Sequence, residues 1–164
     1  MAWVKCELAD FDEAVEVARK AVSLSPNNAQ NVAMLAGVLA RAGEYQNADQ
    51  QIRRAIRLSP IYPAWYLHAL GCNCFALDKN EEAVSAFRSC VERLDPDSSF
   101  MPIARVFLVI CLANAGHDVE AKTMSEEVFR LDPSFQIDDW WQFPRKDQMQ
   151  RNRAVKIWNK IIPR

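Results

Sequence analysis

Glycine is scarce in this chain, and its scarcity excludes the common phosphate-binding motifs. The 164 residues contain only four glycines: Gly37, Gly43, Gly71 and Gly116. A dinucleotide-binding loop and a P-loop both need clustered glycines, because their backbone must approach the phosphates closely. No two glycines here are close enough for that purpose. The sequence therefore gives no support for Rossmann-type or kinase-type chemistry, and we expect no cofactor.

Long apolar runs are also missing. The longest uncharged apolar segments lie near residues 32–40 and 106–113, whereas a membrane-spanning helix needs about 20 apolar residues. The N-terminal residues are charged from Lys5 to Asp12 and lack an apolar core, so they do not resemble a signal peptide. We expect no membrane span and a cytoplasmic location.

Cysteine and histidine are too few and too scattered for a metal or catalytic site. An odd number of cysteines fits reduced thiols better than a disulfide framework. The five are Cys6, Cys72, Cys74, Cys90 and Cys111. His68 and Cys72 share a helix face, but a structural zinc site needs four ligands. His117 stands far from both along the chain, and no nucleophile–base arrangement can be assembled. We therefore expect no metal and no enzyme activity.

A recurring phrase organises most of the chain. Apolar runs that end in proline recur at spacings of 34 to 37 residues: Ala21–Pro26, Ala55–Pro60, Cys90–Pro96 and Val128–Pro133. A small residue opens a stripe of apolar side chains before each run, at Ala14, Ala48, Ala83 and Ala121. Spacings of three and four residues mark one face of a helix. Each proline prevents that helix from continuing.

A turn precedes each stripe, which predicts helical hairpins. Gly43 and Gly116 stand in two of the turns, where glycine suits the positive φ of a helix C-terminal cap. The first helix of the third pair shows the pattern Leu67-x-x-Leu70-Gly71-x-x-Cys74. These features together resemble the tetratricopeptide repeat (TPR), W-x-x-L-G-x-x-Y…A-x-x-x-F…P, with a period of about 34 residues. The chain departs from that pattern in the missing Trp and in one extra residue before Pro96.

The TPR resemblance implies an all-α, right-handed solenoid of helical hairpins over residues 1–133. We expect a partial unit at 1–26 and full units at about 27–61, 62–97 and 98–133. The first unit lacks the front half of its first helix. We therefore hypothesise that the chain was cut from a longer protein.

The tail after the repeats has a different pattern. Residues 134–146 form an aromatic-rich linker, and Asp147 could cap a basic amphipathic helix over 147–164 that closes the array. Its apolar stripe comprises Ala154, Ile157, Trp158 and Ile161. We expect three tryptophans to anchor the tail by packing: Trp140, Trp141 and Trp158.

The net charge of −1 conceals a split between the array and the tail. The last twenty residues carry seven positive charges and one negative, or +6, which leaves −7 for the remainder. The favoured interpretation is that the basic helix packs onto the acidic array. The alternative is that it binds nucleic acid or an anionic surface.

The tail also has a narrower resemblance. It is carried by Leu131-Asp132-Pro133-x-Phe135, by Phe143-Pro144-Arg145-Lys146-Asp147 and by the ending Lys160-Ile161-Ile162-Pro163. These stretches resemble the C-terminal TPR regions of bacterial class III adenylate/guanylate cyclase-like proteins, although Gln148 replaces a usual Pro. The resemblance implies a regulatory region whose catalytic domain precedes Met1.

The TPR resemblance implies a concave groove lined by the first helix of each pair. The expected groove residues are Met34, Arg41, Trp65, His68, Cys72, Phe75, Ile103, Phe107, Ile110 and Asn114. Most are apolar, so the groove suits a helical or apolar protein segment better than a C-terminal carboxylate. Three occupants remain open: a partner protein or peptide, the chain's own tail, and a second copy. The implied function is a non-catalytic protein-interaction scaffold, with homo-oligomerisation as an alternative.

Overall fold

A computed structural model of the chain describes residues 10–140 and 146–162. These residues form eight α-helices and one short 3₁₀ helix, with no β-strand among them. The α-helices are α2 (Phe11–Leu24), α3 (Ala29–Arg41), α4 (Tyr45–Leu58), α5 (Ala64–Ala76), α6 (Asn80–Arg93), α7 (Met101–Asn114), α8 (Asp118–Leu131) and α9 (Met149–Ile161). The 3₁₀ helix η1 spans Ile137–Trp140. The all-α expectation is confirmed.

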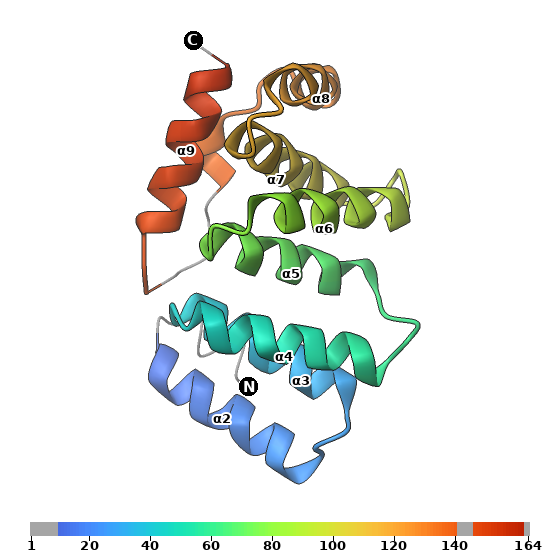
Figure 1. Ribbon diagram of the computed structural model, residues 1–164, viewed down its shortest axis with the longest axis vertical. Helices are drawn as coiled ribbons and strands as arrows, with labels where there is room; N and C mark the ends of the chain where they lie inside the picture. The colour runs from blue at the N-terminus through green and yellow to red at the C-terminus, as the bar shows by residue number, and fades with distance from the viewer. Residues whose placement is uncertain (1–9, 141–145, 163–164) are drawn as a thin grey trace.

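The helices stack as successive hairpins (Figure 1). Helix α3 pairs with α4, α5 with α6, and α7 with α8. Neighbouring pairs meet through α4 and α5 and through α6 and α7. Helix α2 packs against α3 at one end of the stack, and α9 packs mainly against α7 at the other. The chain therefore forms the expected solenoid of helical hairpins with a C-terminal capping helix.

Small residues let the two helices of a pair approach closely. The alanines that open the four apolar stripes are completely buried: Ala14, Ala48, Ala83 and Ala121. Helix α5 lies so near α6 at Gly71 that an added Cβ would be 2.5 Å from the ring of Phe87. The small residues of the repeat pattern thus set how closely the two helices of a pair can pack. Because protein interiors are close-packed, larger residues would not fit at these positions.

The turns inside the hairpins share one backbone geometry. Gly43 and Gly116 adopt positive φ angles of 86° and 87°, as the sequence predicts for helix caps. After the first of them, the N–H of Glu44 donates to the carbonyl oxygen of Leu39 at 2.9 Å. In the turn between α5 and α6, Asp78 occupies the equivalent position and also has a positive φ, of 59°. The third unit therefore holds a side chain where the second and fourth have none.

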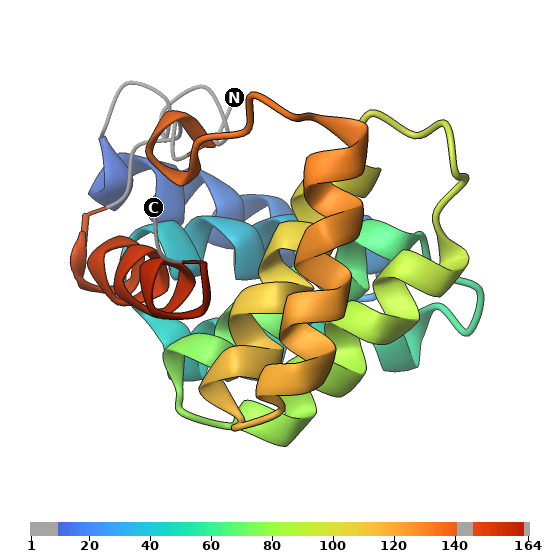
Figure 2. The ribbon, with the colours of Figure 1, turned by 90° about the horizontal axis from the view of Figure 1, so that it is seen from above.

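One buried cluster joins the last two hairpins to the tail. It contains side chains from α5 to α8 together with Ala154, Trp158 and Ile161 of α9. Smaller clusters hold α2, α3 and α4 together. Figure 2 shows α9 lying beside α7 when the stack is seen from above. The tail is therefore part of the core at this end of the molecule.

Candidate functional site

The predicted groove residues of the third unit lie along α5. Trp65, His68 and Cys72 are half-buried, and Phe75, one turn further on, is buried. Because residues three and four apart share a helix face, these side chains form one stripe. Helix α5 thus contributes a continuous, largely apolar surface.

Aromatic rings enclose the imidazole of His68. Its centroid lies 4.8 Å from that of Phe100, 5.3 Å from that of Phe107 and 5.5 Å from that of Phe87, all in edge-to-face geometry. The Sγ atom of Cys72 lies 3.9 Å from both ring nitrogens. Edge-to-face packing of this kind stabilises a ring in one orientation. The surroundings of His68 therefore favour a packing role over metal binding.

On α7, the predicted groove residues are covered. Phe107 is buried and stacks on Phe87, with ring centroids 5.3 Å apart and planes at 5°. Ile110 is buried in the same cluster as Trp158, and Ile103 packs against that cluster. Helix α9 packs against α7, and its Trp158 belongs to the same buried cluster as Phe107 and Ile110.

The remaining groove residues lie on α3 and at the end of α7. Met34 is half-buried, whereas Arg41 is buried and its carbonyl oxygen accepts the N–H of Lys146 at 2.9 Å. The Nδ2 atom of Asn114 donates to Oδ1 of Asn80 at 2.6 Å, which links two consecutive hairpins. Arg41 and Asn114 thus connect segments of the chain itself.

The tail turns back across the array before α9 reaches α7. We call residues 146–153 the tail strap. The Nζ atom of Lys146 lies 3.1 Å from Oδ1 of Asp12 on α2. The hydroxyl of Tyr45 donates to Oδ2 of Asp147 at 3.5 Å. The tail strap therefore connects the C-terminal part of the chain to α2 and to the α3–α4 hairpin.

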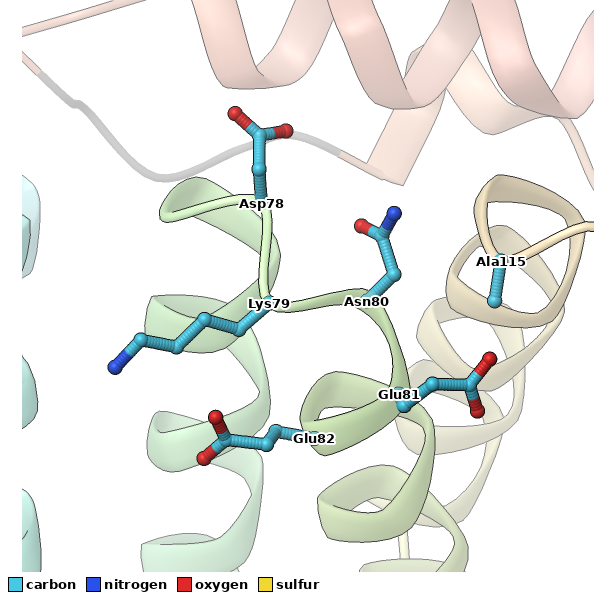
Figure 3. A pocket seen from close by; sticks show the side chains of 6 residues that line it. All are labelled: Asp78, Lys79, Asn80, Glu81, Glu82 and Ala115. Atoms are coloured by element: carbon cyan, nitrogen blue, oxygen red, sulfur yellow. The ribbon is translucent and has the colours of Figure 1, made fainter.

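Arg153 reaches the end of α5 and meets three groups there. Its guanidinium carbon lies 4.6 Å from the centroid of the Phe75 ring. Its Nη1 donates to the carbonyl oxygen of Phe75 at 3.2 Å, and its Nη2 lies 2.5 Å from Oδ1 of Asp78. We call Phe75 and Asp78 the arginine corner. Figure 3 shows Asp78 pointing away from Glu81 and Glu82, which lie on the following helix.

The C-terminal half of α9 is held by apolar packing instead. Trp158 is only 4% exposed, and its ring lies 5.2 Å from that of Phe135 and 6.1 Å from that of Phe129, between centroids. Ala154 and Ile161 are buried beside it. Among the described side chains of the tail, Trp158 therefore packs α9 against Phe129 and Phe135.

Two sequence predictions fall outside the described residues. One is the incomplete first helix, which was expected before residue 10. The other is the packing of Trp140 and Trp141. The backbone of Trp140 is described, at the end of η1, but its side chain and the whole of Trp141 are not.

An open hollow of about 370 Å³ lies at the turn between α5 and α6 (Figure 3). Its lining residues are Asp78, Lys79, Asn80, Glu81, Glu82 and Ala115. Two of the charged groups form ion pairs with α4 of the preceding hairpin: Lys79 lies 3.2 Å from Asp49, and Glu82 lies 2.6 Å from Arg53. These pairs join consecutive units, so the hollow belongs to the framework of the array.

The buried thiols are protected against ionisation. Burial, together with the nearby carboxylate of Asp49, raises the pKa of Cys74 to about 11. Burial and the neighbouring Cys72 raise the pKa of Cys90 to about 11 as well. Burial raises the pKa of Cys111 well above its ordinary value. Since the thiolate is the reactive form, these cysteines are inert at neutral pH.

Within the described ranges, no three side chains of His, Cys, Asp or Glu gather as metal ligands would. None of the helices placed by the structure is long and apolar enough to cross a membrane.

Residues 7–90, just over half of the chain, match the family model described as anaphase-promoting complex, cyclosome, subunit 3, a TPR-like family. The chain belongs to this family of TPR proteins. No curated protein matches its sequence significantly. The family agrees with the hairpin geometry described above, and it places the chain among proteins that are built for interaction.

Solved structures show the same TPR fold. YrrB, described as a TPR protein with an unusual peptide-binding site, superposes with a TM-score of 0.69 at 21% identity, covering 98% of this chain and 81% of that one. MamA gives 0.71 at 20% identity, covering 99% and 92%. TPR-like repeats of a putative kinesin light chain from Podosopora anserina give 0.71 at 15% identity, covering 99% and 94%.

The arginine corner is the feature that sequence reasoning missed. Its signal is the aspartate at position 78, which stands where Gly43 and Gly116 stand in the other described turns. The cationic partner, Arg153, comes from a helix whose place on the array the repeat pattern does not specify. Only the folded chain brings the two together.

Proposed function

We propose that this chain is a non-catalytic binding module whose concave face, formed by α3, α5 and α7, takes a helical or apolar segment of another protein. The supporting observation is that α7 already packs against an amphipathic helix, because α9 places Ala154, Trp158 and Ile161 in one buried cluster with side chains of α7. Helix-in-groove recognition uses the same spacing of apolar anchors. Met34 and Trp65 are half-buried residues of this face, so a partner segment can still reach them.

Site-specific photo-crosslinking in the cells that make this protein tests the proposal. A crosslinking amino acid is placed at Trp65 on α5, and a matched control is placed at Val119, which is 82% exposed on α8. We expect a discrete protein adduct from position 65 and none from position 119. Equal labelling at both positions, or none at either, would refute the groove.

We propose further that the module is the regulatory C-terminal region of a bacterial adenylate cyclase-like protein. The tail sequence supports this, from Leu131 through the Phe143–Asp147 stretch to the ending at Pro163. The test is the coding sequence immediately upstream of Met1 in the genome of origin. A class III cyclase domain in the same reading frame is expected, and an in-frame stop codon there would rule it out.

The proposed compartment is the cytoplasm. The cysteines that the structure describes are all free thiols, which suits a reducing environment. Fractionation of cells that express the tagged protein should recover it with a cytoplasmic marker. Recovery with the membrane or secreted fraction would contradict the proposal.

The basic tail offers nucleic-acid binding as a second candidate, and its ion pairs argue against it. Lys146, Arg151 and Arg153 pair with the chain's own Asp12, Asp138 and Asp78. Nucleic-acid affinity that depends on such cations falls steeply with salt. Binding of a labelled DNA or RNA duplex that persists at 50 mM salt and vanishes at 200 mM would favour this candidate.

Homo-oligomerisation is the other candidate. Light scattering across a concentration series decides it, since an oligomerisation module shows a mass that rises with protein concentration, whereas a partner-binding module remains monomeric.

A further inference from the structure

We propose that the arginine corner is a receptor for an arginine side chain of a partner protein, and that Arg153 occupies it while no partner is bound. This proposal rests on the proposed function, because it names the chemistry of the segment that the groove binds. The partner segment is a basic amphipathic helix.

The corner contacts a guanidinium group on three sides. The ring of Phe75 lies against its face, the carbonyl oxygen of Phe75 accepts one N–H, and Asp78 pairs with a second nitrogen. A planar, delocalised cation with several fixed donors satisfies all three contacts at once. Lysine offers a compact charge without a flat face, so the corner selects arginine.

Asp78 holds its carboxylate on a backbone conformation that disfavours most side chains. Its φ of 59° lies in the left-handed region, where the equivalent turns use Gly43 and Gly116. A residue with a Cβ is disfavoured there, although aspartate and asparagine tolerate it best. Strained residues cluster at binding sites, where the side chain serves a purpose. At this position the purpose is to present a carboxylate beside the ring of Phe75.

The ion pair between Arg153 and Asp78 is exposed enough for another arginine to replace Arg153. Asp78 is 75% exposed in its side chain and Arg153 is 26% exposed, so solvent reaches the pair. Exposed pairs contribute little net stability, because water competes for both charges. The apolar anchor Trp158 is a separate contact further along α9. An incoming arginine can therefore displace Arg153 without releasing Trp158.

The tail itself indicates what the corner accepts. Arg153 precedes a stripe formed by Ala154, Trp158 and Ile161, and α9 carries four positive side chains and no negative one. The 144 residues before Arg145 carry −7. A partner helix with an arginine beside an apolar stripe matches the corner and the adjoining face of α5. A phosphate group would be repelled by the negative charge of the Asp78 carboxylate, so the corner does not suit a phosphorylated partner.

The direct test uses small probes and the full chain. N-acetyl-arginine amide is titrated against wild type and Arg153→Ala, with the backbone NMR signals of residues 75–79 as the readout, and N-acetyl-lysine amide is the matched control. We expect Arg153→Ala to bind the arginine probe about tenfold more tightly than wild type. The lysine probe should show no such gain, and adding Asp78→Asn should abolish it. Equal binding of both probes, or no gain in Arg153→Ala, would overturn the receptor.

A second arm tests the partner class. A labelled peptide with the sequence of residues 149–161 should bind the Arg153→Ala chain about tenfold more tightly than the same peptide with lysine in place of its second arginine. Equal affinities would overturn the proposal. Light scattering measures the mass of the wild-type chain and of Arg153→Ala in parallel. A wild-type dimer that becomes a monomer in Arg153→Ala would mean that the corner binds a second copy of this chain, and would overturn the proposal of a different partner protein.

The two proposals fail in distinguishable ways. If Asp78→Asn leaves the crosslinked adduct at position 65 intact, the groove binds a partner without the arginine corner. If the adduct itself is absent from wild type, the groove proposal fails, whatever the probes show.

Discussion

Gly71 on α5 lies directly against the ring of Phe87 on α6, and the added Cβ of any other residue would be 2.5 to 2.9 Å from three ring carbons. Phe87 is completely buried and stacked on Phe107. The ring therefore cannot move aside without disturbing the aromatic group around His68. This contact fixes the distance between the helices of the third unit.

We expect Gly71→Ala to destabilise the chain by about 2 kcal/mol, because overpacking outweighs the better helix propensity of alanine. Urea unfolding followed by circular dichroism measures the change. The matched control is Gly116→Ala, where an added Cβ meets nothing within 4 Å and only the φ of 87° is unfavourable. That variant should lose about 1 kcal/mol. Equal losses in the two variants would refute the packing explanation.

The carboxylate of Asp49 joins the second and third units. Its two oxygens accept from Nε of Arg53 at 3.1 and 3.0 Å, and Nζ of Lys79 lies 3.2 Å away. These hydrogen bonds raise the pKa of Arg53. Because Asp49 is buried, we expect Asp49→Asn to cost about 2 kcal/mol.

Thermal unfolding of Asp49→Asn is compared with that of Asp12→Asn. Asp12 is 89% exposed in its pair with Lys146, so its loss should change the free energy of unfolding by less than about 0.5 kcal/mol. Equal effects would show that burial of Asp49 does not matter.

The buried thiols predict a loss of stability at alkaline pH. The unfolded thiol ionises near pH 9.0, whereas folded Cys74 and Cys90 have pKa values of about 11. Between these values the unfolded state releases protons that the folded state retains. The contribution of these thiols to the free energy of unfolding is therefore fully present below pH 9. It falls as the pH rises toward 11, by about 1 kcal/mol per pH unit for each thiol.

Urea unfolding at pH 8, 9 and 10 measures this decline, and Cys74→Ala is the control. The variant should show a shallower decline than wild type. An identical slope would mean that the thiol of Cys74 does not contribute.

The strain at Asp78 predicts an unusual order of variants. Asp78→Gly removes the ion pair with Arg153 and the strain together, whereas Asp78→Ala removes the pair and keeps the strain. We expect Asp78→Gly to be more stable than Asp78→Ala by about 1 kcal/mol. Differential scanning calorimetry of both variants checks the order. A more stable alanine variant would show that the left-handed conformation carries no cost.

Much of the fold could be predicted because its causes are local in sequence. The buried alanines, Gly43 and Gly116 stand at fixed positions within each unit, and each acts on residues nearby. The site was less accessible to such reasoning. Phe107 and Ile110 have the spacing of groove residues, yet both are buried, Phe107 against Phe87 and Ile110 in the cluster that also holds Trp158 of α9. Covering of this kind depends on where the tail lies, and repeat spacing does not specify that.

The tail strap changes how the array unfolds. In a simple repeat array each unit touches only its neighbours, so the ends fray independently and stability is a sum of local terms. Here the N–H of Lys146 donates to the carbonyl of Arg41, more than one hundred residues earlier in the chain. We expect a contact of such high sequence separation to couple the unfolding of the α3–α4 hairpin to that of the tail, and to slow folding. The two ends of the described array would then unfold together, as those of a globular domain do, rather than fray one unit at a time.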